Sequence, residues 1–279
     1  MKKIIAAHDI SGLGKASLGS ALPIISVMGS VVCCLPTAVL STITGVYEGY
    51  SITDLTEQMK DTIAHWKNLN TNFDMIYSGF LANSGQVDII INAAKSFNNC
   101  YFVADPVFAD NGQLYQTMNL DMVKSMRRLI SSANIITPNF TEACFLLGET
   151  MDKTSEQSAK QWLRKLNNMG PERVVITSFP FGDEMFIVAY DKKSDAFWKL
   201  KYKHIPVDFH GTGDVFTSVL CGAFARGDSF ESAITLAADF AKNTINATIN
   251  EDWDLRQGLL IEKRLTTLAN VVKSKCERF

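Results

Sequence analysis

Long apolar runs and an excess of either charge are both missing from this chain of 279 residues. No stretch reaches the roughly 18 uninterrupted apolar residues that a membrane-spanning helix needs, so we expect no membrane span. Lysine and arginine number 27, and aspartate and glutamate 29, which gives a net charge of -2. Because a basic excess is what attracts nucleic acid or an anionic membrane, this balance argues against both partners and favours a small-molecule ligand.

Cysteine pairs and linker sequences are scarce as well. None of the six cysteines forms a CxxC pair, so the sequence favours neither a zinc site nor a disulfide framework. Reduced thiols are typical of the cytoplasm, the location we expect. The first residues, Met1–Ala7, reach His8 and Asp9 before they build a long apolar stretch, which indicates a strand rather than a signal peptide. No Pro/Gly/Ser linker or repeat interrupts the chain, so we predict a single domain over residues 1–279.

What the chain does contain is an alternation of strand-like apolar runs and helical periodicity. We predict strands at Lys2–Ala7, Ser30–Leu35, Met75–Ser78, Tyr101–Ala104, Asn134–Ile136, Arg173–Thr177, Met185–Tyr190 and Ala196–Tyr202, the last two forming a hairpin. We predict helices at Ser17–Met28, Ile52–Leu69, Ser84–Phe97, Asn119–Ser132, Phe140–Leu147, Ser155–Asn168, Gly213–Arg226, Ser229–Thr248 and Leu255–Lys273. This order predicts an α/β fold whose mostly parallel sheet carries helices on both faces. Ligands of such sheets bind beyond the carboxyl ends of the strands.

The first strand is followed by a glycine-containing loop, His8-Asp-Ile-Ser-Gly-Leu-Gly-Lys15. Glycines at such a place allow the backbone to approach a ligand closely. The chain has no GxxxxGK[ST] and no complete GxGxxG, so it supports neither a Walker loop nor a dinucleotide fingerprint. A tight turn between strand and helix explains the two glycines equally well.

Carboxylates follow a later strand, in the turn-rich segment Asp105-Pro-Val-Phe-Ala-Asp110-Asn-Gly-Gln-Leu-Tyr115. Hard cations prefer oxygen ligands, so Asp105 and Asp110 could organise cations around a polyphosphate. Ordinary Asp-Pro and Asp-Asn-Gly turn chemistry is the structural alternative.

Hydroxyl and amide side chains follow the next two strands. In Thr137-Pro-Asn-Phe-Thr-Glu142, Thr137 is suited to cap the helix that follows, and Pro138 suits a first helical position. Capping leaves the direction of Asn139 and Glu142 unexplained. Thr177-Ser178 place two hydroxyls at a strand end, where they could bond phosphate oxygens, although a polar strand exit requires no function.

The most informative segment is Asp208-Phe-His-Gly-Thr-Gly-Asp214, which opens a helix. Gly211 and Gly213 let backbone N–H groups turn inward beside the positive end of the helix dipole, and together these form an anion hole. A carboxylate at that place is explained if Asp214 accepts a proton from an attacking hydroxyl while the hole stabilises a phosphoryl group in transfer. The alternative is an acidic residue that only caps the helix after a glycine turn.

Taken jointly, these segments resemble the ribokinase-like superfamily, and within it the pyridoxal/pyridoxamine (vitamin B6) kinases. Gly211-Thr-Gly-Asp214 matches the GxGD anion hole and base of that superfamily, and Thr137–Glu142 matches the TPNxxE of the B6 kinases. Asp105–Tyr115 is similar to their DPVxGDxGxxY. Ser41-Thr-Ile-Thr-Gly45 resembles the SxHTG-like loop that contacts the pyridine, and Asp254-Leu-Arg256 resembles an ELR near their C-terminus. The resemblance covers nearly the whole chain.

The chain also departs from that pattern at three places. Ala109 stands where a glycine is usual, and Ile43 stands in place of a histidine. The segment that begins at His8 looks more like the pyridoxamine-kinase branch than the best-known pyridoxal kinases. These departures leave the preferred B6 vitamer open.

The resemblance implies a three-layer α/β/α fold and a role for each matching residue. It implies that Asp214 is the base for the substrate hydroxymethyl group and that Gly211, Thr212 and Gly213 hold phosphoryl oxygens. ATP contacts are implied for Asp105, Thr137, Asn139, Glu142, Thr177 and Ser178, with Asp105 and Glu142 also organising Mg²⁺ through water and phosphates. Substrate contacts are implied for Asp9, Ser11, Thr44, Phe80 and Tyr115. A monovalent cation such as K⁺ and a homodimer are further expectations from the family.

Two other functions compete with B6 phosphorylation. A hydroxymethylpyrimidine kinase of the same superfamily would act on a similar flat heteroaromatic alcohol, but Asp214 fits the B6 kinases better than the cysteine that is frequent in the hole of that family. A ligand-binding regulator that kept the fold without catalysis is the rival from another class. The intact Gly211–Asp214 segment argues against the regulator.

Overall fold

The computed structural model describes residues 1–44, 46–151, 154–202 and 209–269. Its strands are β1 (Lys3–Leu13), β2 (Val31–Thr42), β3 (Ile52–Asp54), β4 (Met75–Ser78), β5 (Tyr101–Ala104), β6 (Ala109–Asp110), β7 (Gln113–Leu114), β8 (Ile135–Ile136), β9 (Arg173–Phe181), β10 (Glu184–Asp191) and β11 (Ala196–Tyr202). The α-helices are α1 (Leu18–Val27), α2 (Thr56–Asn68), α3 (Ser84–Ser96), α4 (Leu120–Ser131), α5 (Phe140–Leu147), α6 (Glu156–Asn168), α7 (Thr212–Ala225) and α8 (Phe230–Ile249).

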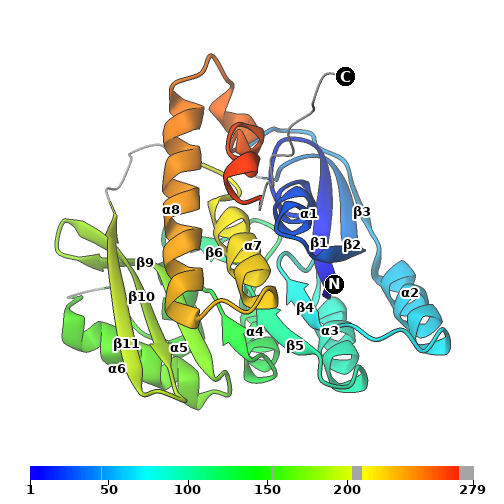
Figure 1. The fold of residues 1–279 in the computed structure, drawn as a ribbon, viewed down its shortest axis with the longest axis horizontal. Coiled ribbons are helices and arrows are strands. Elements are labelled where there is room, and N and C mark those ends of the chain that lie inside the picture. The colour runs from blue at the N-terminus through cyan, green and yellow to red at the C-terminus, as the bar shows by residue number, and fades with distance from the viewer. Residues whose placement is uncertain (45, 152–153, 203–208, 270–279) are drawn as a thin grey trace, which may run out of the picture.

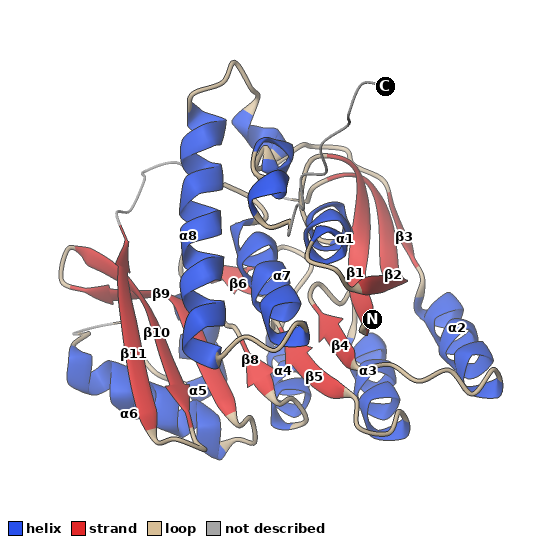
Figure 2. Ribbon diagram, viewed as in Figure 1, coloured by secondary structure: helices blue, strands red, loops and turns tan. Residues whose placement is uncertain are grey.

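A nine-stranded sheet in the order β11-β10-β9-β8-β5-β4-β1-β2-β3 forms the middle layer. Its centre, from β9 through β8, β5, β4 and β1 to β2, is parallel. The antiparallel pairs lie at the two edges, where β10 joins β9 and β11 and where β3 joins β2. The predicted mostly parallel sheet and the β10–β11 hairpin are therefore confirmed, and Figure 2 shows the strands crossing the molecule between two layers of helices.

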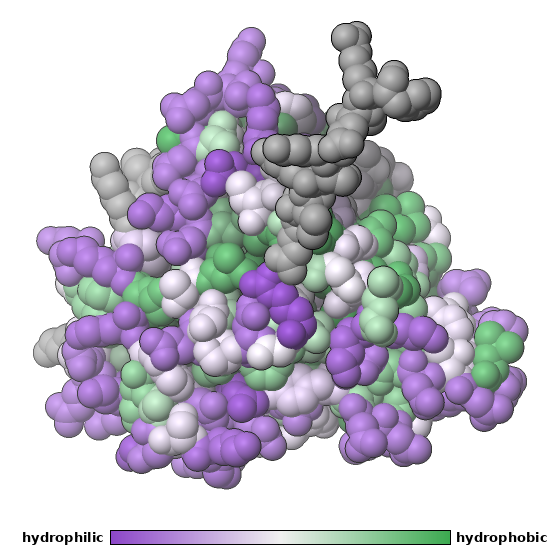
Figure 3. Space-filling view, viewed as in Figure 1, coloured by the Kyte–Doolittle hydropathy of each residue, from purple (hydrophilic) through white to green (hydrophobic). Residues whose placement is uncertain are grey.

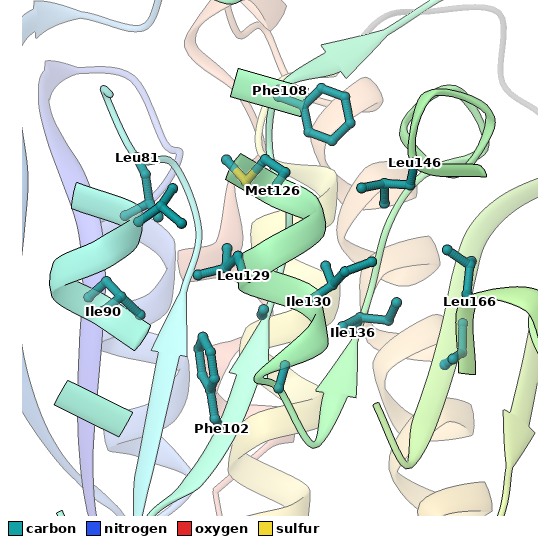
Figure 4. Close-up of a cluster of buried hydrophobic side chains, with 14 of the residues drawn as sticks. Leu81, Ile90, Phe102, Phe108, Met126, Leu129, Ile130, Ile136, Leu146 and Leu166 are labelled. Carbon is teal, nitrogen blue, oxygen red and sulfur yellow. The ribbon is translucent and has the colours of Figure 1, made fainter. Parts of the chain in front are cut away.

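Helices cover both faces of the sheet because successive strand residues, which point to opposite faces, are both apolar. Ile4 packs with α1, α7 and α8 on one face, whereas its neighbour Ile5 packs with α2–α6 on the other. The same alternation separates Met75 from Ile76. Figure 1 shows α1, α7 and α8 in front of the sheet. In the core of the opposite face, Figure 4 shows Leu129 and Ile130 of α4 pointing toward Phe102 of β5 and Ile136 of β8. The predicted three-layer α/β/α arrangement is confirmed.

Two predicted helices are corrected by the structure. Ile52–Leu69 is not one helix, because Ile52–Asp54 forms a strand against Ala38–Leu40 and the helix begins only at Thr56. The β-branched Ile52 and Thr53 suit that strand. The predicted final helix is instead a series of short 3₁₀ turns at Leu255–Gln257, Ile261–Lys263 and Leu265–Thr267, and residues 270–273 lie outside the described residues.

The surface and the cysteines agree with the composition. The face in Figure 3 is mostly hydrophilic, with apolar residues gathered over strands β1–β3, where Ile10, Val39 and Ile52 are exposed. In the part of the chain that the structure describes, no helix has the length and apolar character needed to cross a bilayer. The five described cysteines, Cys33, Cys34, Cys100, Cys144 and Cys221, are all free thiols.

Candidate active site

Four carboxylates meet at the carboxyl edge of the central sheet. Asp9 lies in β1, Asp105 directly follows β5, Glu142 lies in the first turn of α5, and Asp214 lies in the first turn of α7. They are close enough to influence one another: the charge of Asp9 raises the pKa of Asp214, and the charge of Asp105 raises that of Glu142. The structure therefore brings together the acidic residues that the separate loops of the sequence suggested.

Asp214 is the carboxylate best placed to act as a base. Its side chain is only 12% exposed, and its Oδ2 accepts a hydrogen bond of 2.8 Å from the Ser17 N–H. Burial raises the pKa of Asp214 to about 6, the Asp9 charge adds to this, and the Ser17 N–H opposes it. A carboxylate that titrates close to neutral pH is well matched to proton transfer.

His8 lies beside Asp214 without compensating its charge. The His8 Nδ1 is 3.7 Å from Oδ1 of Asp214, and the ring is fully buried against Tyr77. Burial lowers the pKa of His8 to about 3, so the imidazole is neutral. Gly79 makes room for the ring, since a Cβ at that residue would lie 2.2 Å from His8 Cε1.

The conformation of the glycine loop before α7 is required by its close packing against neighbouring backbone. Gly211 has a φ of 82°, and an added Cβ would lie 2.5 Å from the Lys15 carbonyl oxygen. A Cβ at Gly258 would lie 2.6 Å from the same oxygen. The first hydrogen bond of α7 runs from Val215 N–H to Gly211, so the N–H groups of the three preceding residues stay available at the helix end.

Asp105 is buried among hydroxyl groups. Thr217, one turn beyond Asp214 on α7, donates to Asp105 Oδ2 at 3.2 Å and lies 3.0 Å from the Thr137 hydroxyl. Burial and the charge of Asp214 raise the pKa of Asp105 to about 8, and the two threonine hydroxyls partly oppose this. Thr137 thus belongs to a hydroxyl chain beside Asp105.

The α5 N-terminus explains where Asn139 and Glu142 point. The prediction that Thr137 caps this helix is wrong, because Asn139 is the N-cap and forms a reciprocal capping box with Glu142. The Glu142 carboxylate also accepts the Phe108 N–H at 3.1 Å, and Asn139 Nδ2 donates to the Ala109 carbonyl at 2.8 Å. Burial and the Asp105 charge raise the pKa of Glu142. This pair therefore ties the loop after β5 to α5.

Thr177 and Ser178 lie within β9 rather than at its end, which corrects the predicted strand boundary. The register between β9 and β10 shifts at these two residues, which face the single residue Ile187. Thr177 N–H donates to the Pro138 carbonyl, and Ser178 Oγ accepts the Phe140 N–H at 3.1 Å. The bulge thus holds both hydroxyl residues against the start of α5, as bulges near active sites often do.

The loop predicted after the first strand is itself strand, since β1 continues to Leu13. Its pairing with β2 shifts between His8 and Ile10, at Asp9. Asp9 is buried and accepts hydrogen bonds from the Ser11 and Ser17 hydroxyls. The glycines of this segment make room for neighbouring chain: a Cβ on Gly12 would be 3.1 Å from the Ser41 carbonyl oxygen.

The other residues predicted to contact substrate differ in their surroundings. Thr44 is half-buried in the loop after β2. Phe80 is 8% exposed and packs in the apolar core between the sheet and α2–α6. Tyr115 is partly exposed, and burial together with the Glu142 and Asp110 charges raises its pKa. Asp110 itself is exposed and accepts the N–H of Asn111 in the β6–β7 turn.

The segment Asp254-Leu-Arg256 packs on the loop that contains Thr44. Tyr47 donates to Asp254 at 3.3 Å, and the Arg256 guanidinium lies 5.1 Å from the centre of the Tyr47 ring. Just beyond it, Lys15 N–H donates to the Gln257 carbonyl at 2.7 Å. The C-terminal part of the described chain therefore closes one side of the site.

Among the described residues, no group of three or more histidine, cysteine, aspartate and glutamate side chains is arranged to hold a metal ion alone. Asp105 and Glu142 nevertheless offer carboxylate oxygens, and their hydrogen-bond partners are hydroxyl or backbone N–H groups. This pair fits a cation that takes its remaining ligands from water and phosphate, as Mg²⁺ commonly does.

Sequence reasoning missed three residues of this arrangement: Ser17, His8 and Thr217. Ser17 stands at the predicted start of a helix, where serine suggests a cap. Thr217 lies in an apolar helix and gave no signal of its own. His8 was read only as part of the glycine loop, although its place immediately before Asp9 could have indicated that it shares the site.

Comparisons with known proteins identify the family and similar structures. Residues 25–258 match the family model described as phosphomethylpyrimidine kinase. A candidate phosphomethylpyrimidine kinase from Bacteroides thetaiotaomicron, in a crystal form with pyridoxal, is 43% identical with a TM-score of 0.91, covering 96% of this chain and 95% of that one. Pyridoxal kinase from Lactobacillus plantarum is 29% identical with a TM-score of 0.88, covering 96% of both chains.

A curated relative is matched over a shorter part of its length. Pyridoxal kinase from Arabidopsis thaliana is 29% identical over 64% of this chain, and the match spans 59% of the plant protein, less than two thirds. The family match covers more than half of the chain, including the segments around Asp105, Thr137 and Asp214. The chain therefore belongs to the phosphomethylpyrimidine kinase family, and its predicted membership of the ribokinase-like superfamily beside the B6 kinases is confirmed.

Proposed function

We propose that the protein transfers the γ-phosphoryl group of ATP to the hydroxymethyl group of a B6 vitamer: pyridoxal, pyridoxamine or pyridoxine. The observation that carries this proposal is Asp214, a buried carboxylate with a pKa of about 6 at the N-terminus of α7. The 43% identical relative crystallised with pyridoxal supports the choice of alcohol.

In this proposal Asp214 is the general base. As the substrate O–H bond breaks, its proton passes to the Asp214 carboxylate and the alcohol oxygen attacks the γ-phosphorus. The bond between that phosphorus and the leaving ADP oxygen breaks at the same time. The N–H groups of Thr212 and Gly213, beside Gly211 at the positive end of the helix, offer hydrogen bonds to the phosphoryl oxygens.

The nucleotide would lie along the loops that follow β5 and β8 and along the bulge within β9. Asp105 and Glu142 would hold Mg²⁺ through water and phosphate oxygens, and the ion would supply positive charge against the phosphates. Thr137, Asn139, Thr177 and Ser178 surround the α5 N-terminus, and their hydroxyl and amide groups would contact the phosphates. A requirement for a monovalent cation such as K⁺ stays a prediction of the family resemblance.

The alcohol would lie beside β1. Asp9 and Ser11 offer polar contacts to the ring substituents, and Thr44 offers a hydroxyl from the facing loop. Phe80 can present only a small part of its ring, given its burial. Tyr115 would approach from the β6–β7 side, where the acidic residues lie around its hydroxyl group.

Hydroxymethylpyrimidine is the second candidate substrate, because the matched family is described by a pyrimidine kinase. The test is steady-state kinetics with ATP and Mg²⁺ on pyridoxal, pyridoxamine, pyridoxine, hydroxymethylpyrimidine and ribose. We expect a B6 vitamer to have the highest kcat/KM. A higher value for hydroxymethylpyrimidine or ribose would show that the substrate assignment is wrong.

A non-catalytic regulator would behave differently in the same assay. It would bind ligand and release no ADP, and the Asp214→Ala variant would bind as the wild type does. ADP release that depends on both alcohol and Asp214 would exclude the regulator.

We also propose a homodimer formed through strands β1–β3, on the side of the sheet that ends in β3. The exposed apolar residues Ile10, Leu13, Val39 and Ile52 support it, because large apolar side chains gathered on one surface are typical of an interface. Sedimentation of the wild type and of a Val39→Asp variant tests this proposal. A wild type that sediments as a monomer at high concentration would contradict it.

A further inference from the structure

Ser17 has a backbone conformation that a serine rarely adopts. Its φ of 53° and ψ of -128° lie in a region that is essentially restricted to glycine. The other described non-glycine residues with positive φ are asparagines and one aspartate, Asn70, Asn99, Asn111 and Asp195, types that tolerate positive φ more readily. Ser17 is also only 6% exposed, so a surface irregularity does not explain it.

The side chain of Ser17 does not serve the helix that it precedes. It occupies the N-cap position of α1, yet its hydroxyl makes no capping hydrogen bond. The hydroxyl instead donates to Oδ1 of Asp9 at 2.5 Å, while the backbone N–H donates to Oδ2 of Asp214 at 2.8 Å. A single residue therefore bonds two buried carboxylates that belong to different elements of the fold.

The conformation and the two bonds explain each other. Glycine would adopt this backbone without strain and would still present the N–H to Asp214, but it has no hydroxyl for Asp9. An ordinary N-cap serine would satisfy its own helix and leave both carboxylates without this partner. Serine at this position therefore makes sense only if the bond to Asp9 has a use.

We propose that Ser17 is a positioning residue that fixes the substrate-facing Asp9 and the base Asp214 relative to each other. This inference rests on the proposed function, since it assumes that Asp9 orients the alcohol whose proton Asp214 accepts. Loss of the hydroxyl would free Asp9 and misalign the alcohol. The nucleotide side of the site, around Asp105 and Glu142, has no bond to Ser17.

Two substitutions separate the hydroxyl from the backbone strain. Ser17→Ala removes the hydroxyl and keeps a Cβ in the unfavourable conformation, whereas Ser17→Gly removes both. We expect kcat/KM for the B6 alcohol to fall about 10- to 100-fold in both variants, the range for a lost hydrogen bond to a charged group. We expect the KM for ATP to stay unchanged. The Tm should be higher for Ser17→Gly than for Ser17→Ala, because only the alanine keeps the strain.

Asn99→Gly is the matched control, because it relieves positive φ at an exposed residue at the opposite edge of the sheet. It should keep wild-type kinetics. A Ser17→Gly variant with wild-type kinetics would overturn the inference, and so would an equal rise in the KM for ATP. If the wild type phosphorylates no alcohol of the panel, the proposed function itself fails. If the wild type is active and Ser17→Gly is equally active, only the proposed role of Ser17 fails.

Discussion

Buried charges are compensated differently at the amino ends and at the carboxyl ends of the strands. At the amino ends of β5 and β9, Arg173 donates to Asp191 at 3.1 Å and to the Tyr101 hydroxyl at 2.6 Å, and its guanidinium lies over the rings of Phe224 and Phe230. At the carboxyl edge, Asp9, Asp105, Glu142 and Asp214 have hydroxyl groups, backbone N–H groups and the neutral His8 as neighbours. Within the described ranges, no lysine or arginine forms an ion pair with any of these four residues.

Arg173 is therefore compensated by partners within the chain, whereas the four carboxylates have no cationic partner among the described residues. A buried ion needs a partner, and an uncompensated one shifts its pKa to become neutral. The pKa values of Asp105 and Asp214 are raised because both carboxylates are buried near another carboxylate, which makes their charged forms unfavourable. Cations and proton donors brought by substrates would stabilise these charged forms. The Arg173 charge, in contrast, is already compensated by Asp191.

The largest effect on activity should come from Asp214→Asn. The amide keeps the shape of the side chain but cannot take the substrate proton, so we expect turnover to fall about 10²- to 10⁴-fold. Calorimetry should show that ATP still binds. Asp121→Asn is the control, because Asp121 also lies in the first turn of a helix, at the exposed start of α4. Near-normal turnover of Asp214→Asn would refute the role as base.

At the opposite edge, Arg173→Met should reduce stability and leave catalysis intact. The substitution strands the Asp191 carboxylate, and breaking a buried pair in this way costs on the order of 3 kcal/mol. Denaturant unfolding measures the loss. Lys124→Met breaks the exposed Lys124–Asp121 pair and should cost less than about 1 kcal/mol. If the kcat of Arg173→Met falls together with its stability, Arg173 also affects catalysis, and the contrast between the two ends of the strands is wrong.

Asp105→Asn should increase stability, whereas Arg173→Met reduces it. The native pKa of Asp105, about 8, lies above its ordinary value of 3.8. The stability that this group contributes is therefore complete below about pH 4 and is lost as the pH rises through about 8. The variant does not titrate, so its Tm relative to wild type should rise between about pH 5 and pH 9, measured without nucleotide or Mg²⁺. A difference that shrinks with rising pH would be the contrary result.

The smallest effect should follow from Glu142→Gln. Glutamine keeps one oxygen acceptor but loses the charge and one of the bonds to the Asn139 and Phe108 N–H groups. We expect a several-fold higher Mg²⁺ concentration at half-maximal rate, because the cation loses a carboxylate nearby. Glu149→Gln, in an ion pair with Lys165 away from the site, serves as control. An unchanged Mg²⁺ titration would remove Glu142 from the metal site.

The sequence could predict the layers and the central strands because their signals are local. Runs such as Met75–Ser78 and Tyr101–Ala104 are short and mostly apolar, and the structure has both with the same limits. The extension of β1 through Gly12 was missed because its partners lie in β2, far along the chain. Ile52–Asp54 was assigned to the following helix for the same reason.

The site was predictable in its residue types and less so in its contacts. The GxGD of Gly211–Asp214 is a local motif that predicts an anion hole, whereas the bonds of Ser17 to Asp9 and Asp214 join three separate segments. The capping box of Asn139 and Glu142 has a local signature, yet the preceding threonine and proline suggested a different cap. Gly258 lies inside the predicted helix Leu255–Lys273, and a glycine is needed there because a Cβ would lie 2.6 Å from the Lys15 carbonyl oxygen.

The carbonyl of Lys15, enclosed by Gly211 and Gly258, sets the order in which the site can be completed during synthesis. The strands that carry Asp9 and Asp105 leave the ribosome early and can pair with their neighbours while the rest is being made. The loop before Asp214 gains its final support only after residues 254–258 have emerged and closed over Lys15. A nascent chain that stops short of Gly258 would hold every strand of the nine-stranded sheet and every acidic residue of the site, yet it would lack the contacts of residues 254–258 that support the loop before Asp214.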